Sequence, residues 1–162
     1  MSLTMYSASV PVFVRMLGNM LNWLDKAEAH AMARKFDSGN YLGLRLAPDM
    51  LPFNRQIQIA SDGAKGCVAR LAGIEVPKWD DNEASMAELR SRVVKTSEYV
   101  QTFGAEQIDG TEQREILLPT RQGDPLRVHG ETYLKHYVLP NFYFHATTAY
   151  ALLRHAGVEL GK

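Results

Sequence analysis

The chain has 162 residues, which suits one domain with a substantial hydrophobic core. A hydrophobic fraction of 46% and a charged fraction of 22% are ordinary for a soluble globular protein. Basic and acidic residues both number 18, so the net charge is zero, and neither a nucleic-acid partner nor an acidic tail is expected.

The sequence favours the cytoplasm. Its single cysteine, Cys67, cannot form an internal disulfide, which fits a reducing compartment. We expect Cys67 to be a small buried hydrophobic residue. The N-terminal residues lack the basic and apolar regions of a signal peptide, and no apolar run approaches the roughly 18 residues of a membrane span. No membrane partner is therefore expected.

Helical spacing of apolar residues predicts two long helices in the first half of the chain. The first begins near Pro11 and ends before the turn-forming residues 37–40. The second covers about residues 50–72 and ends at Gly73, because glycine is common directly after a helix.

Two glycines, Gly63 and Gly66, lie inside the second predicted helix. Each lowers helix propensity by about 1 kcal/mol relative to alanine. Because close approach of a second helix would explain such a cost, we expect a neighbouring helix to pack against them.

A linker over residues 74–82 precedes the third predicted helix, and Trp79 within it is expected to pack onto the bundle. The third helix begins after Ser85, which starts a capping-box pattern, and ends at Gly104. The alternating pattern that follows predicts a small β-hairpin over residues 114–129.

The fourth predicted helix spans about residues 131–156, and Pro140 inside it predicts a kink. Together these elements predict an all-α fold, a four-helix bundle with a small β-hairpin inserted between helices 3 and 4, in a single domain over residues 1–162.

The fourth helix also carries the candidate site. Asn141 and His145 are four residues apart, so they share one helix face, one turn apart. Their neighbours on that face are mostly apolar. A histidine in such surroundings needs a hydrogen-bond partner or a ligand, which makes both residues candidates for a pocket.

Several separated blocks of sequence resemble one family over nearly the whole chain. They are Tyr6-Ser-Ala-Ser-Val-Pro-Val-Phe13, Leu24-Asp-Lys-Ala-Glu-Ala-His30, Leu46-Ala-Pro-Asp-Met50, Ala69-Arg-Leu-Ala-Gly73, Leu139-Pro-Asn-Phe142 and the helix ending Leu152-Leu-Arg-His-Ala-Gly157. The pattern is similar to the DUF1993 branch of the bacterial DinB/YfiT-like superfamily, a branch with no assigned activity. The resemblance implies a DinB-like bundle and a homodimer.

The resemblance also implies where a metal would lie. Members of the superfamily often use three histidines, one from helix 2 and a His-xxx-His pair from the last helix. By this resemblance, His145 occupies the second position of the pair and Asn141 the first. Helix 2 has no histidine, and Gln58 and Asp62 stand near the expected position. A degenerate metal site is therefore expected around these four residues.

Three interpretations of that pocket stay open. His145 and Asp62 would give zinc or nickel only two good ligands where three are usual, so no cofactor is expected and a divalent metal is the alternative. His145 could instead be satisfied by Asn141, Gln58 or Asp62 in a buried polar cluster. The pocket could also bind a small organic ligand.

Asp62 has an alternative of its own. If its side chain is exposed to solvent and not turned into the bundle, it would pair with Lys65, three residues further along the helix.

The sequence names no reaction, and no catalytic residue is assigned. We expect a small-molecule-binding or non-catalytic protein. One alternative, implied by the resemblance, is a metal-dependent thiol transferase or hydrolase-like enzyme, with His145 as ligand or general base. The other is a structural or interaction homodimer that uses aromatic residues of the last helix, Tyr143 and Tyr150 among them.

Overall fold

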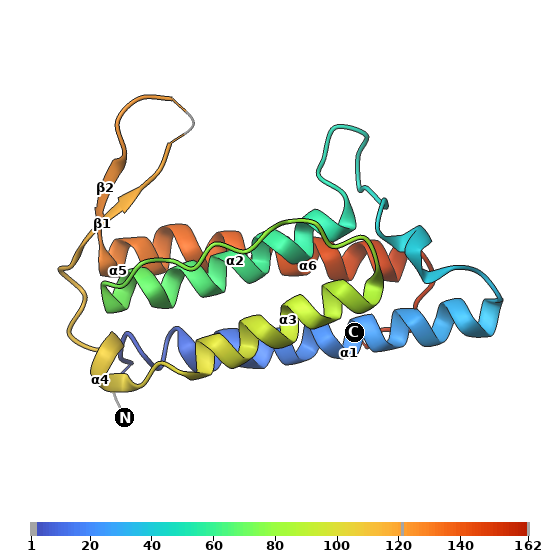
Figure 1. The fold of residues 1–162 in the computed structure, drawn as a ribbon, viewed down its shortest axis with the longest axis horizontal. Coiled ribbons are helices and arrows are strands. Elements are labelled where there is room, and N and C mark those ends of the chain that lie inside the picture. Colours follow the sequence, from blue (N-terminus) through green and yellow to red (C-terminus); the bar gives the residue numbers. More distant parts are fainter. Residues whose placement is uncertain (1–2, 121, 162) are drawn as a thin grey trace.

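The computed structural model describes residues 3–120 and 122–161. Four long helices pack side by side, and a two-stranded hairpin protrudes from one end (Figure 1). The helices are α1 (Val10–Arg34), α2 (Phe53–Ala72), α3 (Met86–Gln101) and α6 (Leu139–His155). The shorter elements are η1 (Ser38–Tyr41), α4 (Ala105–Ile108), β1 (Glu115–Leu118), β2 (Leu126–His129), α5 (Gly130–Thr132) and η2 (Tyr133–Val138). The predicted bundle with an inserted hairpin is confirmed.

The long helices follow an up-down-down-up order (Figure 1). α2 packs mainly against α6 and α3, while α1 packs mainly against α3. α1 and α2 therefore lie on a diagonal of the bundle, and α2 faces α6 across one side of it. Within the described residues, none of the helices has the length and apolar character that a membrane crossing requires.

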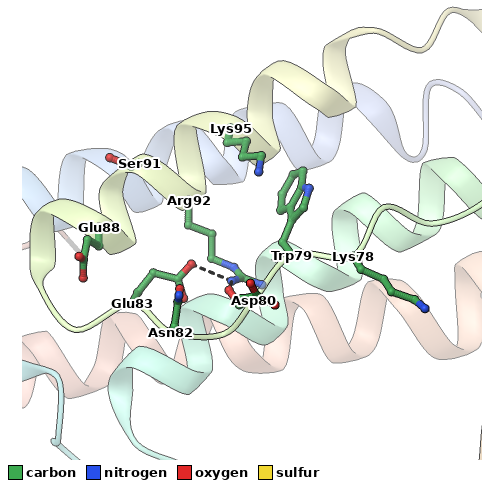
Figure 2. Close-up of a pocket in the computed structure, with 9 residues that line it drawn as sticks. All are labelled: Lys78, Trp79, Asp80, Asn82, Glu83, Glu88, Ser91, Arg92 and Lys95. Carbon is green, nitrogen blue, oxygen red and sulfur yellow. Dashed lines mark hydrogen bonds and ion pairs between the residues drawn. The ribbon is translucent and has the colours of Figure 1, made fainter.

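Because α2 and α3 run in the same direction, residues 73–85 must return along the bundle to join them (Figure 1). Trp79 of this crossover contacts both helices, with its ring centroid 4.4 Å from Nζ of Lys65 on α2 and 4.4 Å from Nζ of Lys95 on α3. Arg92 reaches from α3 to the crossover (Figure 2), where it donates to Glu83 at 2.8 Å. Trp79 packs onto the bundle as expected.

Helix ends follow local chemistry, with two shifts from the predicted boundaries. α2 begins three residues later than predicted, because Pro52 is extended and the Phe53 amide donates to the Leu44 carbonyl at 2.8 Å. Gly73, with φ of 73°, ends the helix as predicted. α3 ends at Gln101, before the predicted Gly104.

The predicted kink at Pro140 takes the form of a wide helical turn. In η2 the Leu139 amide donates to the Leu134 carbonyl, five residues back, as in a π-helix. Pro140 consequently falls in the first turn of α6, where its missing N–H needs no partner. The irregular turn that accommodates the proline is therefore η2, directly before Pro140.

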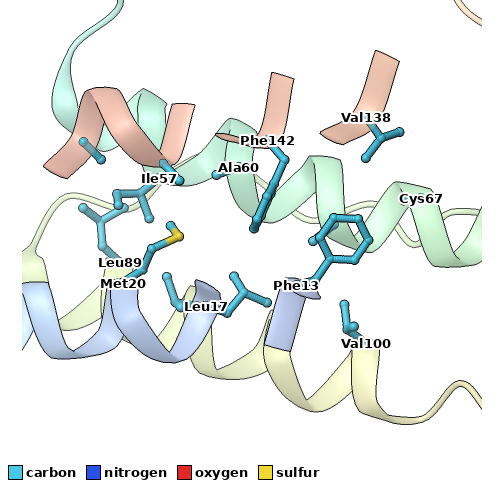
Figure 3. Close-up of a cluster of buried hydrophobic side chains, with 14 of the residues drawn as sticks. Phe13, Leu17, Met20, Ile57, Ala60, Cys67, Leu89, Val100, Val138 and Phe142 are labelled. Carbon is cyan, nitrogen blue, oxygen red and sulfur yellow. The ribbon is translucent and has the colours of Figure 1, made fainter. Parts of the chain in front are cut away.

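The core fills the space between the four helices (Figure 3). Phe13 of α1 and Phe142 of α6 pack edge to face, with ring centroids 5.0 Å apart. Cys67 is fully buried, and burial raises the pKa of its thiol. It acts as the small buried hydrophobic residue that the sequence predicted.

The hairpin is attached to the bundle by one face of β1. Its strands pair antiparallel, from Glu115 opposite His129 to Leu118 opposite Leu126. Ile116 and Leu118 are buried while their neighbours are exposed, as strand alternation requires. The hairpin base thus lies beside the last helical segment.

Candidate functional site

A cavity of about 320 Å³ lies between α2, the η2–α6 segment and the end of β1. Ligand pockets usually measure about 300–1,000 Å³, so this one suits a small molecule. Three residues predicted from the sequence line it, Asp62, Asn141 and His145, and Gln58 is not among the lining residues. Apolar walls come from Ile59, Leu118, Val138 and Phe142.

His145 is oriented by Gln56, a residue that the sequence interpretation did not single out. Nδ1 of His145 lies 2.7 Å from Oε1 of Gln56, and Nε2 of Gln56 donates to the Leu51 carbonyl at 2.9 Å. Because the Gln56 nitrogen faces Leu51, its oxygen faces the imidazole, and Nδ1 must carry the proton. The second ring nitrogen, Nε2, then offers a lone pair, and it has no hydrogen-bond partner within residues 3–120 and 122–161.

Burial keeps that imidazole neutral. His145 is half-buried, and the loss of water around it lowers its pKa below the ordinary value. A neutral ring with a protonated Nδ1 is a hydrogen-bond acceptor at Nε2 near neutral pH.

Asn141 contributes less than its position suggested. It is exposed, and its Nδ2 donates to the Tyr137 carbonyl one turn back, at 2.6 Å. Its side chain thus satisfies the backbone of its own helix, and it lines the cavity without bonding to His145.

Gln58 is buried but turned away from the cavity. Its Oε1 accepts from Arg55 at 2.7 Å and its Nε2 donates to Glu83 of the crossover at 2.7 Å. Two residues correspond to about 200° of rotation on a helix, so Gln56 and Gln58 point to opposite sides of α2. Gln56, and not Gln58, is the α2 partner of His145.

Asp62 lines the cavity and is already paired. Its Oδ1 accepts from Lys65 at 2.7 Å and from Arg92 at 3.0 Å. The pair with Lys65 was the alternative expected for an exposed Asp62, and here the Lys65 side chain is buried while that of Asp62 is 39% exposed. Two cations therefore compete for the carboxylate with any metal or ligand.

Arg70 and Tyr133 form a second polar pair in the cavity. Nη1 of Arg70 donates to the Tyr133 hydroxyl at 3.0 Å, and burial raises the pKa of Tyr133, so that the phenol stays neutral. No sequence motif joins residues that are 63 positions apart, and only the packing of α2 on η2 brings them together.

The two glycines of α2 leave space, one for the cavity itself and one for the side chain of a lining residue. Gly63 lines it, and a Cβ built there would meet nothing within 4 Å. A Cβ at Gly66 would overlap Nη1 of Arg70, so this glycine makes room for the guanidinium. The expectation that a neighbouring helix packs closely is wrong at Gly63, where the space is open, and at Gly66 the nearest atoms belong to an arginine of the same helix.

The donor set does not fit the three-ligand metal site that the family resemblance implies. Among the described residues, no group of three or more histidine, cysteine, aspartate or glutamate side chains is placed to hold an ion. The nearest partner of His145 is the amide of Gln56, and a neutral carboxamide is a weak ligand for zinc or nickel. What the residues offer is a set of hydrogen-bonding groups within apolar walls.

Comparisons with known proteins agree with the fold. A family described as domain of unknown function (DUF1993) matches residues 5–162. A crystal structure of a DinB family member protein from Shewanella denitrificans is 42% identical, covering 97% of this chain and 88% of that chain with a TM-score of 0.89. No curated protein matches the sequence. The chain therefore belongs to the DUF1993 family and has the fold of a DinB family member.

Proposed function

We propose that this protein binds a small organic molecule in the cavity between α2 and α6, without a metal ion. The observation that carries the proposal is the bond between Gln56 and His145, which fixes the imidazole and leaves its Nε2 for a ligand. A few placed polar groups within apolar walls are the usual composition of a small-molecule site.

Gly63 supports the same conclusion. A glycine inside a helix costs about 1 kcal/mol relative to alanine, and here the position has free space for a larger residue. The sequence thus keeps a less stable residue where a side chain would enter the cavity. Such sacrifices of stability are typical of functional sites.

A pair of glycine variants tests the proposal. Small carboxylates and thiols, at millimolar concentration, are screened by thermal shift against the wild type, Gly63→Leu and Gly18→Leu. Gly18 also lies inside a long helix with nothing within 4 Å of its Cβ, but it is exposed, belongs to α1 and is not among the residues that line the cavity. We expect some compounds to raise the Tm of the wild type and of Gly18→Leu, and Gly63→Leu to lose the shift.

Two results would contradict the proposal. Equal shifts in all three proteins would place binding outside the cavity, and no shift in any of them would favour a structural role. Zinc and nickel titration provides the metal control. Stoichiometric metal in the wild type that disappears in His145→Ala would show that the site holds an ion after all.

A further inference from the structure

Arg70 is held in the cavity with its charge exposed to a ligand. It lies in the last turn of α2, but its guanidinium folds back one turn to lie beside Gly66. One neutral bond, to the Tyr133 hydroxyl at 3.0 Å, fixes Nη1. Tyr133 is almost fully buried, so the group that orients Arg70 is itself rigid.

The positive charge of Arg70 has no counterpart in the described part of the chain. Arg70 makes none of the salt bridges formed by residues 3–120 and 122–161. The other charged lining residue, Asp62, is neutralised by Lys65 and Arg92, and burial lowers the pKa of His145. The cavity as a whole therefore carries about one uncompensated positive charge.

An arginine near a helix end has an ordinary explanation, because a cation there interacts favourably with the terminal carbonyls. Arg70 does not take that geometry. Its guanidinium turns away from the helix end toward Gly66, and a larger residue at position 66 would displace it. A half-buried guanidinium without an anion is costly, and an incoming anion would offset that cost.

We infer that the ligand of this cavity is a small organic monocarboxylate whose carboxylate binds Arg70. This inference rests on the proposed function and adds its chemical class. Guanidinium groups bind carboxylates through paired N–H···O bonds, and Nη2 and Nε of Arg70 donate to none of the described residues. A single positive charge matches a monoanion, whereas a phosphate ester would require further cations.

The other residues that line the cavity indicate which further groups the ligand carries. The rings of Tyr133 and Tyr137 stack with centroids 5.9 Å apart, and Val138 and Phe142 add apolar surface. His145 Nε2 has a lone pair that a ligand donor can use. The ligand thus has an apolar body, a carboxylate for Arg70 and an N–H or O–H donor for His145.

Matched acids and amides test the inference, because they share size and shape but differ in charge. Affinities of a panel of such pairs, among them benzoate with benzamide and 4-hydroxybenzoate with 4-hydroxybenzamide, are measured by calorimetry. We expect the wild type to bind acids at least about tenfold more tightly than amides. Arg70→Gln should lose that preference, while Arg90→Gln, which removes an exposed arginine paired with Asp25, should keep it.

Gly66→Ala provides a second variant that keeps every charged group. Its methyl group displaces the guanidinium, so acid binding should weaken while amide binding persists. Equal binding of acids and amides, both abolished by Gly63→Leu, would overturn the carboxylate inference and leave the proposed function intact. An acid preference that survives in Arg70→Gln would also overturn it. No binding by any compound of the panel would overturn the carboxylate inference, and no hit in the thermal-shift screen of carboxylates and thiols as well would overturn the proposed function.

Discussion

The chemistry of the cavity comes from neighbours that are distant in sequence. Gln56 and His145 lie 89 residues apart, on α2 and α6, and each fixes the orientation of the other. An amide in this place satisfies one ring nitrogen and carries no charge. Burial keeps the imidazole neutral and the amide orients it, which suits recognition of a polar organic group better than retention of a metal ion.

The lowered pKa of His145 predicts a pH-dependent stability. An unfolded histidine titrates near 6.5, and the folded residue titrates below that value, so the unfolded chain binds the proton more readily. Stability is therefore fully present above the unfolded pKa and is lost as the pH falls toward the folded pKa. We expect the free energy of unfolding in urea to decrease from about pH 7.5 to about pH 5.5.

Two variants test whether His145 causes this pH dependence of the stability. His145→Gln should show a smaller decrease over the same pH range, because the titrating group is gone. His155→Gln removes an exposed imidazole ten residues further along α6 and should retain the wild-type dependence. If both variants behave like the wild type, His145 does not control the pH response.

The sequence anticipated the α6 lining of the cavity better than its α2 lining. Helical spacing placed Asn141 and His145 correctly on one face, because two residues four positions apart share a helix face whatever packs around the helix. Gln56 could also have been found, since it extends the buried stripe of Ile57 and Ala60 toward the start of α2. Arg70 could not, because its orientation depends on Tyr133, which only the tertiary packing brings near.

At the level of elements, the crossover over residues 73–85 is held by ionic contacts. Arg92 of α3, with its side chain about 2% exposed, donates to Glu83 at 2.8 Å (Figure 2). It also donates to Asp81 at 2.8 Å and to Asp62 on α2. Burial disfavours the charged guanidinium, but these carboxylates raise the pKa of Arg92 above its ordinary value. One side chain thus joins α2, α3 and the crossover.

Removal of that side chain should destabilise the bundle strongly. Arg92→Met leaves three carboxylates without their shared partner, and breaking a buried ion pair in this way costs about 3–5 kcal/mol. Because Asp62 and Asp81 are about one-third exposed, we expect the lower end, about 3 kcal/mol in the free energy of unfolding. Urea denaturation measures it.

A matched arginine lies two residues away. Arg90 lies on α3, like Arg92, and forms a single exposed ion pair with Asp25 of α1. Arg90→Met removes that pair, which solvent screens. We expect a much smaller loss of stability from it. Equal losses in the two variants would show that helix propensity, and not the ionic network, explains the effect.

Element boundaries were predictable where local signals dominate. Gly73 and the hairpin turn ended their elements as expected, because backbone conformation alone decides them. The start of α2 and the wide turn before Pro140 could not be predicted. Each depends on a backbone hydrogen-bond partner that the pattern of apolar residues does not encode. Leu44 accepts the first α2 amide, and Leu134 accepts the Leu139 amide in η2.

For the whole molecule, the order of helices determines where a cavity forms. The crossover makes α2 the common neighbour of α3 and α6, so one side of α2 faces the ionic network and the other faces His145. Apolar periodicity identifies a buried face on each helix, but it does not say which helix covers it. The position of Gln58 on the network side follows from this topology.

The outer face of α6 carries more apolar surface than an isolated bundle needs. Tyr143 and Phe144 of α6 are 41% and 53% exposed, and Tyr137 of the preceding η2 is 50% exposed. Tyr150, named with Tyr143 as an interface residue, is instead used within the chain, because it packs on Trp23 and donates to the Gly161 carbonyl at 3.1 Å. Clustered exposed aromatic side chains are typical of protein interfaces.

We therefore expect a homodimer that buries this face of α6. Light scattering of the purified protein at micromolar concentration should give a mass of about 36 kDa, twice the 18.2 kDa of one chain. Phe144→Asp places a charge within the aromatic face and should yield monomers, because burying an unpaired carboxylate is costly. Met32→Asp changes a hydrophobic residue near the end of α1 that is even more exposed, at 79%, and should leave the mass unchanged. A wild-type mass near 18 kDa would contradict the dimer, and a dimer that survives Phe144→Asp would move the interface to another face.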